Sequence, residues 1–558
     1  MNKTAIKNFA VWARRKLIED ITYKAGLIGV SDKGIAEELP QSTNDLKFFD
    51  IGTKNYAEVS GNEIKQREAL VSAIKSKERE IEDYNEAFEC VIEEVAYTWF
   101  NRLIAIRFME VNDYLPSRLR VLSSENPSKN EPDFVTTPFD TDLEFTPFEQ
   151  DKVIELKDTN KSDELFRMLF IKQCNKLNEI LPELFEKTDD YSELLLAISF
   201  TDKDGVVYHL THDIAEDDFN VSKEGQVEII GWMYQYYNTE PKDKVFALLK
   251  KNVKITKERI PAATQLFTPD WIVRYMVENS LGRLWLEGHE NDSLKSKWKY
   301  YLDEAKQKPD VEAQLEQIRQ GYKNTKPEDI KVIDPCMGSG HILVYAFDVL
   351  MQIYTAQGYA ERDAAKNIIE NNLFGLDIDT RAYQLAYFAV MMKARQYNRR
   401  ILNGEVKPNL YAIDDSSVLT SNIIDFIANG NGKLKSDLQS IAEDLYNAKE
   451  YGSIIDAATV DFATIYFRID EIKDHFYEDI FGQDNQRIVL ANVLPIIKQA
   501  EVMAQKYDVV VTNPPYMGAS GMSAKLSAYV KTNYPDSKSD LFAVFIERSG
   551  QMGKCFKR

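Results

Sequence analysis

The chain carries the stretch Y-D-V-V-V-T-N-P-P-Y-M-G at residues 507–518. Its apolar run, Val509–Val511, predicts a short buried strand. Asn513 and Tyr516 enclose two prolines, which fix the backbone angle φ and remove two hydrogen-bond donors, so we expect a stiff loop after the strand. Because open α/β sheets bind ligands at the carboxyl ends of their strands, this loop is expected to face a ligand.

The region upstream of this stretch predicts a parallel sheet. From about residue 260 onward, short apolar runs alternate with helical patterns, as in sheets whose strands are joined by crossover helices. The expected strands are Ile330–Ile333, Leu373–Leu376, Leu410–Ile413 and Val509–Val511. Residues 417–500 are expected to form a mostly helical insertion before the last of these strands.

The chain as a whole is expected to have three parts. Residues 1–215 are expected to form a mostly helical domain, because apolar and charged residues alternate at helical spacing up to about residue 114 and a second helical set follows from about 161 to 198. Residues 216–262 are expected to be connecting helices, and residues 263–558 an α/β domain. Within the first part, residues 115–160 are rich in Pro, Ser, Asn and Asp and predict a long loop, whereas Asp202–Gly205 predicts a tight turn between two short strands.

The composition limits the possible classes of protein. The chain has 558 residues, a formal net charge of −20, 4 cysteines and 5 histidines. It lacks a run of about eighteen apolar residues and a signal-peptide core, so no membrane contact is expected. The cysteines and histidines are not spaced as metal ligands, which predicts a cytoplasmic protein without a metal site. The negative charge argues mildly against nucleic-acid binding, unless basic residues gather locally or in another part of the protein.

A glycine-rich loop follows the first expected strand. It is Asp334-Pro-Cys-Met-Gly338-Ser-Gly340, and such glycines let a backbone approach a ligand closely while the next helix offers free N–H groups. Alone the loop is weak evidence, since a nucleotide site or a plain tight turn has the same pattern. Leu343 excludes the dinucleotide motif G-x-G-x-x-G. Asp334 favours a cationic ligand group, because its carboxylate would repel a pyrophosphate.

Carboxylates also follow the next two expected strands. Asp377 ends the second strand, where an acid can accept both hydroxyls of a ribose, and Asp379 is placed to cap the next helix. Asp414 or Asp415, after the third strand, could hold an adenine amino group. Singly, each acid is more often a helix cap or a turn residue. Together with Asp334 they outline a pocket for an adenosine that carries a positively charged tail, which describes S-adenosylmethionine.

The order of these motifs resembles the amino-methyltransferases that modify N6 of adenine in DNA. The segment F-T-P (Phe267-Thr268-Pro269) precedes D-P-x-x-G-S-G, G-L-D-I-D, D-D-S and N-P-P-Y, as in the group that includes type I modification subunits. Within that group, the amino-terminal sequence and Tyr97–Glu110 resemble the adenine methyltransferases of BREX phage-defence systems. The resemblance covers essentially the whole chain. It implies a Rossmann-like class I methyltransferase domain, preceded by a mostly α-helical domain.

The resemblance also implies roles for individual residues. The residues expected to bind S-adenosylmethionine are Phe267 and Thr268 at its methionine end, Asp334, Gly338 and Gly340 along its methionine and ribose, Asp377 at the ribose hydroxyls, and Asp414 or Asp415 at the adenine. Asp415 is favoured over its neighbour because a serine directly follows it. The residues expected to be catalytic are Asn513, Pro514, Pro515 and Tyr516.

The chemistry expected of the N-P-P-Y loop follows from the electronic structure of adenine. The N6 lone pair is delocalised into the ring, so the nitrogen is a weak nucleophile. If the Asn513 side-chain oxygen and the Pro514 carbonyl accept its two N–H bonds, the nitrogen is drawn toward tetrahedral geometry and its lone pair points at the sulfonium methyl. The target adenine must leave double-stranded DNA, and Tyr516 offers a face on which the flipped base can stack.

The family pattern continues beyond the last motif of this chain. Family members have further strands, a second aromatic side chain that closes the base pocket, and a target-recognition domain, and we find none of these in the sequence. We therefore expect a carboxy-truncated form in which the last strand is an exposed sheet edge. Other phage-defence proteins are expected partners. The alternatives are methylation of RNA or of a protein glutamine, which N-P-P-Y also serves, and a non-catalytic scaffold with a vestigial cofactor fold.

Overall fold

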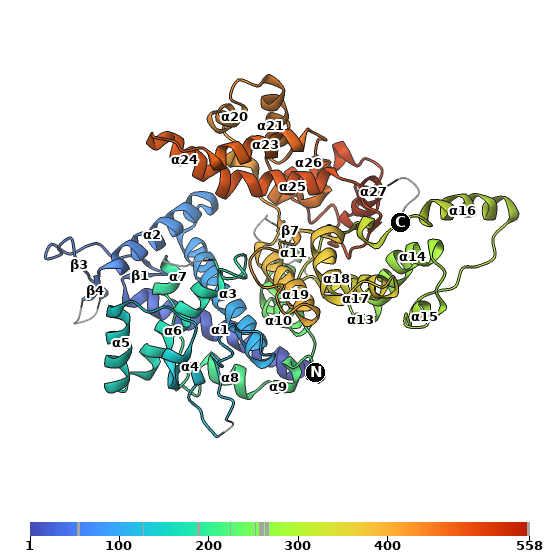
Figure 1. The fold of residues 1–558 in the computed structure, drawn as a ribbon. Coiled ribbons are helices and arrows are strands. Elements are labelled where there is room, and N and C mark those ends of the chain that lie inside the picture. Colours follow the sequence, from blue (N-terminus) through green and yellow to red (C-terminus); the bar gives the residue numbers. More distant parts are fainter. Residues whose placement is uncertain are drawn as a thin grey trace. The chain divides into compact units, whose positions relative to one another are not determined.

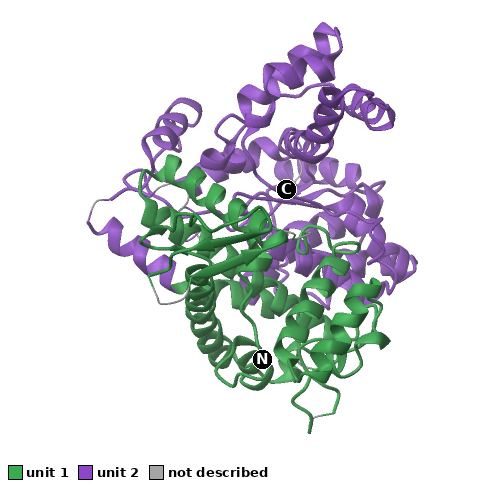
Figure 2. Ribbon diagram, turned by 90° about the vertical axis from the view of Figure 1, so that its left-hand side faces the viewer, with its two compact units in different colours: residues 1–239 green, residues 240–558 purple. Residues whose placement is uncertain are grey.

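The structure, a computed structural model, divides into two compact units. Unit 1 is Met1–Thr239 and unit 2 is Glu240–Arg558, and Figure 2 shows them in different colours. Among the described residues, no helix is long and apolar enough to cross a membrane. The residues that the structure describes are 1–52, 56–126, 128–186, 190–223, 225–251, 253–255, 260, 262 and 267–554.

Unit 1 is built around three long helices, of which α3 (Tyr84–Val111) packs against both α1 (Lys3–Leu27) and α2 (Asn62–Ile81). From Val95 to Val111, every residue of α3 except Thr98 is buried, so this helix forms the centre of the unit. The shorter elements of unit 1 are β1 (Val30–Ser31), β2 (Gly34–Ile35), β3 (Leu46–Phe49), β4 (Ala57–Ser60), α4 (Asp133–Thr136), η1 (Pro138–Asp140), α5 (Pro147–Asp158), α6 (Ser162–Leu177), α7 (Tyr191–Leu194), α8 (Val206–His212), α9 (Glu216–Phe219) and α10 (Ile229–Tyr237).

The arginines of α3 form ion pairs and hydrogen bonds in the interior of unit 1. Arg107 and Glu110 form a buried ion pair at 2.6 Å, and the second carboxylate oxygen of Glu110 accepts the backbone N–H groups of Val121 and Leu122. Arg102 donates to the carbonyl of Glu186 at 2.9 Å. A buried charge is tolerated only when it is paired or hydrogen-bonded, so these arginines fix the packing of α3.

Two local predictions for unit 1 are wrong, and two strand pairs were not foreseen. Residues 115–160 are not one loop, because they include α5, which begins with a capping box formed by Thr146 and Glu149. The turn at Asp202–Gly205 leads directly into α8 and not into a strand, since Val206, Val207 and Leu210 are buried at helical spacing. The antiparallel pairs β1–β2 and β3–β4 were not expected within the helical domain. Each of these elements is short and depends on its packing partners.

Unit 2 contains the predicted parallel sheet. Within the described residues, four strands lie in the order β7-β6-β5-β8 and every neighbouring pair is parallel. The strands are β5 (Val332–Asp334), β6 (Leu373–Asp377), β7 (Asn409–Ala412) and β8 (Val509–Val510), within one or two residues of the expected bounds. Because β5 pairs with both β6 and β8, the segments that follow these three strands meet at one edge of the sheet.

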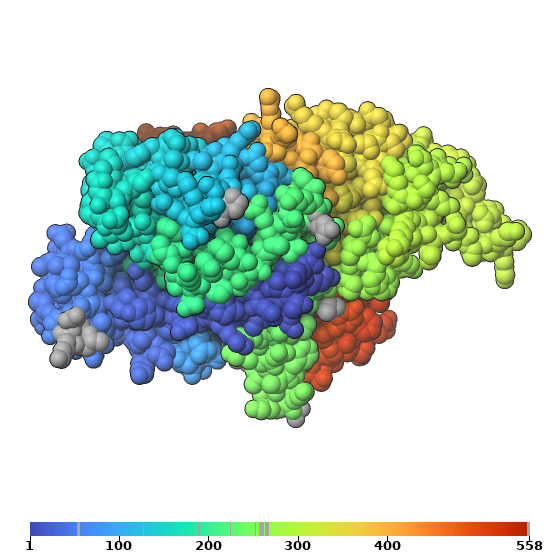
Figure 3. Space-filling model, turned by 90° about the horizontal axis from the view of Figure 1, so that it is seen from below, coloured from blue at the N-terminus to red at the C-terminus, as the bar shows by residue number. Residues whose placement is uncertain are grey.

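Helices connect and flank these strands. Asp379 caps α19 by accepting the backbone N–H of Arg381, as predicted. In Figure 3 the yellow-green atoms of α16, which buries only Tyr322, project from the rest of unit 2. The elements around the first three strands are α11 (Thr239–Leu249), α13 (Asp270–Val277), η3 (Glu278–Gly282), α14 (Arg283–Gly288), α15 (Asp292–Lys295), α16 (Pro309–Tyr322), η4 (Pro327–Asp329), α17 (His341–Ala356), α18 (Glu361–Asn367), η5 (Ile368–Asn372) and α19 (Thr380–Tyr397).

The segment between β7 and β8 is helical, and Figure 1 shows its helices grouped together in orange tones. Its elements are η6 (Ser416–Val418), α20 (Ser421–Ala428), α21 (Gly432–Asp444), α22 (Ala448–Tyr451), η7 (Gly452–Ile454), α23 (Phe462–Asp474), α24 (Ile480–Ile488), η8 (Val489–Val493) and α25 (Leu494–Ala504). Its apolar side chains share one core with residues of the sheet, among them Ile333 and Leu376. The insertion therefore packs against the sheet as part of the same unit.

Among the described residues, β8 is the edge strand of the sheet, as expected, but the chain just before it is paired with a later segment. After β8 come α26 (Ala524–Asn533) and α27 (Leu541–Met552). The backbone N–H of Tyr507 donates to the carbonyl of Met552 at 3.0 Å, and the N–H of Lys554 donates to the carbonyl of Tyr507 at 2.8 Å. The residues that follow α27 thus pair with the chain just before β8, and Val509 in the strand is completely buried.

Candidate active site

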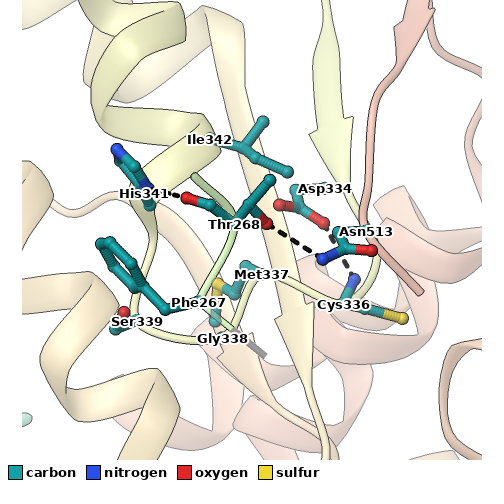
Figure 4. A pocket seen from close by; sticks show the side chains of 10 residues that line it. All are labelled: Phe267, Thr268, Asp334, Cys336, Met337, Gly338, Ser339, His341, Ile342 and Asn513. Atoms are coloured by element: carbon teal, nitrogen blue, oxygen red, sulfur yellow. Dashed lines mark hydrogen bonds between the residues drawn. The ribbon is translucent and has the colours of Figure 1, made fainter. Parts of the chain in front are cut away.

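A pocket lies where β5 and β8 end. It has about 310 Å³ of empty space and brings together the F-T-P segment, the glycine-rich loop and the N-P-P-Y loop (Figure 4). The last two of these segments are far apart in sequence and meet because β5 and β8 are parallel neighbours. The lining residues are Phe267, Thr268, Asp334, Cys336, Met337, Gly338, Ser339, His341, Ile342 and Asn513.

The glycine-rich loop crosses from β5 to the end of β6. The N–H of Met337 donates to the carbonyl of Leu376 at 3.0 Å, and the N–H of Gly338 donates to Asp377 Oδ2 at 2.8 Å. Gly338 has φ +54° and Gly340 has φ +82°, in the left-handed region that favours glycine. The backbone of the loop thereby binds the Asp377 carboxylate and holds it next to the residues that line the pocket.

Replacing Gly340 by alanine is expected to destabilise unit 2 more than the same change at Gly338. A Cβ at Gly340 would lie 3.0 Å from the Cα of Ala386, whereas a Cβ at Gly338 meets nothing within 4 Å. Both variants carry the strain of a positive φ, about 1–2 kcal/mol, and only Gly340→Ala adds a contact with backbone. Denaturant unfolding should show the larger drop in midpoint for Gly340→Ala. Equal drops would contradict a close packing of the loop on α19.

The two acids at the strand ends are costly to ionise. Asp334 is fully buried, and its Oδ1 accepts the N–H of Cys336 at 3.1 Å. Its Oδ2 is buried and meets no partner in hydrogen-bonding geometry in the part of the chain that the structure describes. Burial raises the pKa of Asp334 to about 7, and loss of hydration raises the pKa of Asp377 to about 7. Carboxylates in this condition are stabilised by a cationic or hydroxyl-bearing ligand.

The N-P-P-Y loop follows β8 and presents a polar amide. Asn513 donates from Nδ2 to the hydroxyl oxygen of Thr268 at 3.0 Å, and its Oδ1 accepts the hydroxyl of Tyr516 at 3.1 Å. Pro514 and Pro515 are half-buried, so the backbone between these two side chains is held. Tyr516 itself is 60% exposed and leaves its ring accessible.

An aromatic neighbour of Tyr516 is present, although we found none in the sequence. Phe542, at the start of α27, has its ring centroid 6.2 Å from that of Tyr516, with the planes tilted by 35°. It is 41% exposed. The sequence signal is weak, because a single phenylalanine after Asp540 looks like any amphipathic helix residue. Only the fold brings it to the N-P-P-Y loop.

His341 is a second residue of the site that the sequence did not reveal. It begins α17 directly after the glycine-rich loop, and its ring stacks on Phe267 with centroids 4.4 Å apart and planes within 5°. Its Nδ1 lies 3.0 Å from the carbonyl oxygen of Thr268 (Figure 4). The F-T-P segment is thereby attached to the helix that follows the glycine-rich loop. Its position right after G-S-G is the signal that could have suggested it.

The structure does not bring Asp414 and Asp415 into this pocket. Asp414 pairs with Lys449 Nζ at 2.7 Å, and its side chain is 51% exposed. Asp415 accepts the backbone N–H of Lys449 at 2.8 Å through Oδ1. Both carboxylates therefore contact the start of α22 in the insertion, whereas the other expected cofactor residues line the pocket or adjoin it.

The fold and the site define a class: an α/β chain with a parallel sheet, whose strand ends carry a glycine-rich loop and an N-P-P-Y loop. Comparison with known families agrees with this class. Residues 315–409 match the family described as N-6 DNA Methylase, and residues 371–555 match the Eco57I restriction-modification methylase family. The two matches cover all four strands of the sheet between them.

Two individual relatives are similar over nearly the whole chain. The chain is 44% identical to the adenine-specific methyltransferase PglX of Lacticaseibacillus casei (strain Zhang), over 99% of this chain and 46% of that protein. It is 37% identical to the adenine-specific methyltransferase BrxX of Escherichia coli O9:H4 (strain HS), over 98% of this chain and 45% of that protein. The chain is thus similar, over nearly its whole length, to the adenine-specific methyltransferases PglX and BrxX. It spans about half the length of these curated relatives.

A solved structure that is also similar is the ATP-dependent Type ISP restriction-modification enzyme LlaBIII bound to DNA. It is 14% identical, with a TM-score of 0.31, over 99% of this chain and 24% of that one. A TM-score this low adds nothing to the assignment of the fold.

Proposed function

We propose that this chain is the part of a DNA adenine-N6 methyltransferase that binds S-adenosylmethionine and performs methyl transfer. The observation that carries the proposal is the meeting of Asn513 with Asp334 and the glycine-rich loop in one pocket. An amide suited to hold an amino group and a carboxylate suited to a cationic ligand lie on neighbouring strand ends. The similarity to the adenine-specific methyltransferases PglX and BrxX supports the same reaction.

The residues of the pocket fit S-adenosylmethionine. Bound there, this cofactor would supply an electrophilic methyl group on a sulfonium. The buried Asp334 would regain a favourable partner from the cationic methionine end, and Asp377 would accept the ribose hydroxyls. Gly338, with no side chain and open space at its Cα, would let the backbone approach the cofactor closely, whereas Gly340 would hold the loop against α19. Phe267 and Thr268 would border the methionine end.

The adenine subsite requires one rearrangement if Asp414 or Asp415 is to take part. The Asp414 carboxylate holds Lys449 Nζ and that of Asp415 holds the Lys449 N–H. For either acid to accept the cofactor's amino group, it must use its second oxygen or release Lys449. We propose Asp415 for this role, because one of its oxygens is committed to a backbone N–H that holds the carboxylate in a fixed direction.

The base subsite would be formed by the N-P-P-Y loop. In this proposal a flipped adenine from double-stranded DNA stacks on Tyr516, and its N6 hydrogens are accepted by Asn513 Oδ1 and the carbonyl of Pro514, with Pro515 holding the loop. In the structure, Asn513 Oδ1 accepts a hydrogen bond from the Tyr516 hydroxyl, so the target base must displace this hydroxyl before it can bind. Phe542 stands where a second ring would border the base.

The chain as a whole would act in host defence. We propose that residues 263–558 form the methyltransferase domain with a Rossmann-like sheet, and that residues 216–262 connect this domain to the helical residues 1–215. The helical residues 1–215 would contact DNA or other phage-defence proteins. The protein would work in the cytoplasm and mark host DNA, without a metal.

The direct test is chemical. DNA and RNA are isolated from cells with and without the gene, digested to nucleosides and analysed by mass spectrometry. N6-methyladenine that depends on the gene and appears only in DNA supports the proposal. If the modified base appears in RNA alone, or if neither nucleic acid changes although the purified protein binds S-adenosylmethionine, the proposed substrate is wrong.

Two substitutions of Tyr516 should separate its ring from its hydroxyl. Tyr516→Ala removes the stacking face and is expected to raise the KM for DNA by about tenfold or more, because base–aromatic stacking contributes about 1–3 kcal/mol. Tyr516→Phe keeps the ring and frees Asn513 Oδ1, so the KM should stay at the wild-type value or fall. Steady-state kinetics on a duplex substrate provide the measurement. A Phe variant as poor as the Ala variant would show that the hydroxyl, not the ring, binds the base.

A further inference from the structure

The catalytic amide is held in one orientation by a residue from a distant segment. Asn513 donates from Nδ2 to Thr268 Oγ1 at 3.0 Å, although 245 positions separate the two residues (Figure 4). A primary amide has a donor end and an acceptor end of nearly equal shape, so its neighbours decide which end faces a ligand. Thr268 takes the donor end, and Oδ1 is left on the side of Tyr516.

We propose that Thr268 is a positioning residue, which fixes the Asn513 amide so that its oxygen faces the target base. This inference rests on the proposed function of the N-P-P-Y loop. The amino group of adenine and the Nδ2 of asparagine are both donors. An amide turned by 180° would place donor against donor, and the N6 nitrogen would lose the hydrogen bond that draws it toward tetrahedral geometry.

Thr268 is itself held firmly enough to do this. It is 6% exposed, and its carbonyl oxygen lies 3.0 Å from His341 Nδ1. The preceding Phe267 is stacked on the same imidazole, and the following Pro269 caps α13 and fixes the backbone direction. The hydroxyl is therefore carried by a segment that is tied to the start of α17. The same contacts link the glycine-rich loop with the catalytic loop.

The first experiment compares Thr268→Val with Thr268→Ser in the purified protein. Valine keeps the shape of threonine and removes the hydroxyl, whereas serine keeps the hydroxyl. Loss of one hydrogen bond that orients a reacting group predicts a fall in kcat of about tenfold for Thr268→Val. The dissociation constant of S-adenosylmethionine, measured by calorimetry, reports the cofactor contact of Thr268 separately, and the fall in kcat should exceed any change in this constant. Thr268→Ser should restore most of the rate. A weakened cofactor affinity with unchanged kcat would overturn the proposal and leave Thr268 as a cofactor contact alone.

A double-mutant cycle sharpens the result. In Asn513→Asp the two side-chain oxygens are equivalent, so no orientation remains to be fixed. Adding Thr268→Val to Asn513→Asp should then reduce the residual single-turnover rate by less than about twofold. If Thr268→Val still costs about tenfold when it is combined with Asn513→Asp, Thr268 acts independently of the amide and the inference fails.

A third measurement does not depend on methylation. In protein labelled with ¹⁵N-asparagine, the side-chain signal of Asn513 is identified by its absence in Asn513→Asp. We expect Thr268→Val to shift this signal and to speed its hydrogen exchange, and Thr268→Ser to leave it near the wild-type position. An unchanged signal in Thr268→Val overturns the inference. If the protein never methylates adenine while the signal behaves as expected, the proposed function fails and the orientation by Thr268 stands.

Discussion

Alanine in place of Asn513 is expected to reduce methyl transfer to adenine by at least about a hundredfold in kcat, the cost of removing one group that stabilises developing charge. The side chain lies in the pocket with Asp334, and its Oδ1 can accept the N6 hydrogen once the Tyr516 hydroxyl moves away. Without that acceptor, the N6 nitrogen stays planar and its lone pair is not directed at the methyl group.

The measurement is single-turnover transfer of a labelled methyl group to duplex DNA. Asn533→Ala is the matched control, because Asn533 is an exposed asparagine on α26 whose side chain donates to the backbone of its own helix. It should retain the wild-type rate, and both variants should keep the cofactor affinity. If Asn513→Ala methylates DNA as fast as the control, the N-P-P-Y loop is not the catalytic element, and the chain serves as a scaffold.

Asparagine in place of Asp334 is expected to weaken the binding of S-adenosylmethionine at about pH 8 by about tenfold to a hundredfold, the value of one charged hydrogen bond. Burial raises the pKa of Asp334 to about 7, from an ordinary 3.8. Above that pKa the wild-type carboxylate is therefore mostly ionised and attracts a cationic ligand. Below it the carboxyl group is mostly protonated and resembles asparagine, so the two proteins should differ much less.

The direction of the pH effect follows from the raised pKa. The ligand-free protein holds the proton below about pH 7, and a cationic ligand must displace it, so wild-type affinity should rise as the pH increases through about 7 and then level off. For the same reason, the free energy of unfolding of the ligand-free protein should fall as the pH rises from about 4 to about 7. In this range the folded protein still holds the proton on Asp334, whereas the unfolded chain has released it. Asp377 also has a pKa raised to about 7, so the cofactor affinity of Asp334→Asn should keep a residual dependence on pH.

Calorimetry at about pH 6 and about pH 8, on either side of the raised pKa and in buffers of different ionisation enthalpy, measures both the affinity and the proton released. Asp536→Asn, a change at an exposed acid between α26 and α27, removes the same charge outside the pocket and should match the wild type. Wild-type affinity that is flat across this pH range, with no proton release, would contradict the role of Asp334.

The parts of the fold that were predictable from sequence are those with a strong local signal. The strands β5 and β6 are mostly apolar and almost wholly buried, which is what a strand covered on both faces requires, and Asp379 caps α19 by accepting the N–H of Arg381, two residues further along the chain. By contrast, the local hairpins β1–β2 and β3–β4 and the helix α8 are short elements with weak patterns of their own. Their stability depends on packing within unit 1.

The candidate site shows the same division. Asp334 and the glycines could be placed at a strand end because strand and loop are adjacent in sequence. The bond from Asn513 to Thr268 and the approach of Phe542 to Tyr516 depend on how distant segments pack, and no local pattern encodes them. Asp415 was assigned to the adenine by its place after a strand, but its contact with α22 arises from the insertion, whose path the sequence does not reveal.

The insertion between β7 and β8 also contacts the glycine-rich loop of the site. Ser453 Oγ donates to the carbonyl of Pro335 in the glycine-rich loop at 2.5 Å, and Arg548 on α27 bonds both Asp456 and the carbonyl of Met503. The segment is thus not an interchangeable module. During evolution, changes in the insertion and in the loops it touches have to be accepted together, and an engineer who excises it would remove a support of the catalytic centre.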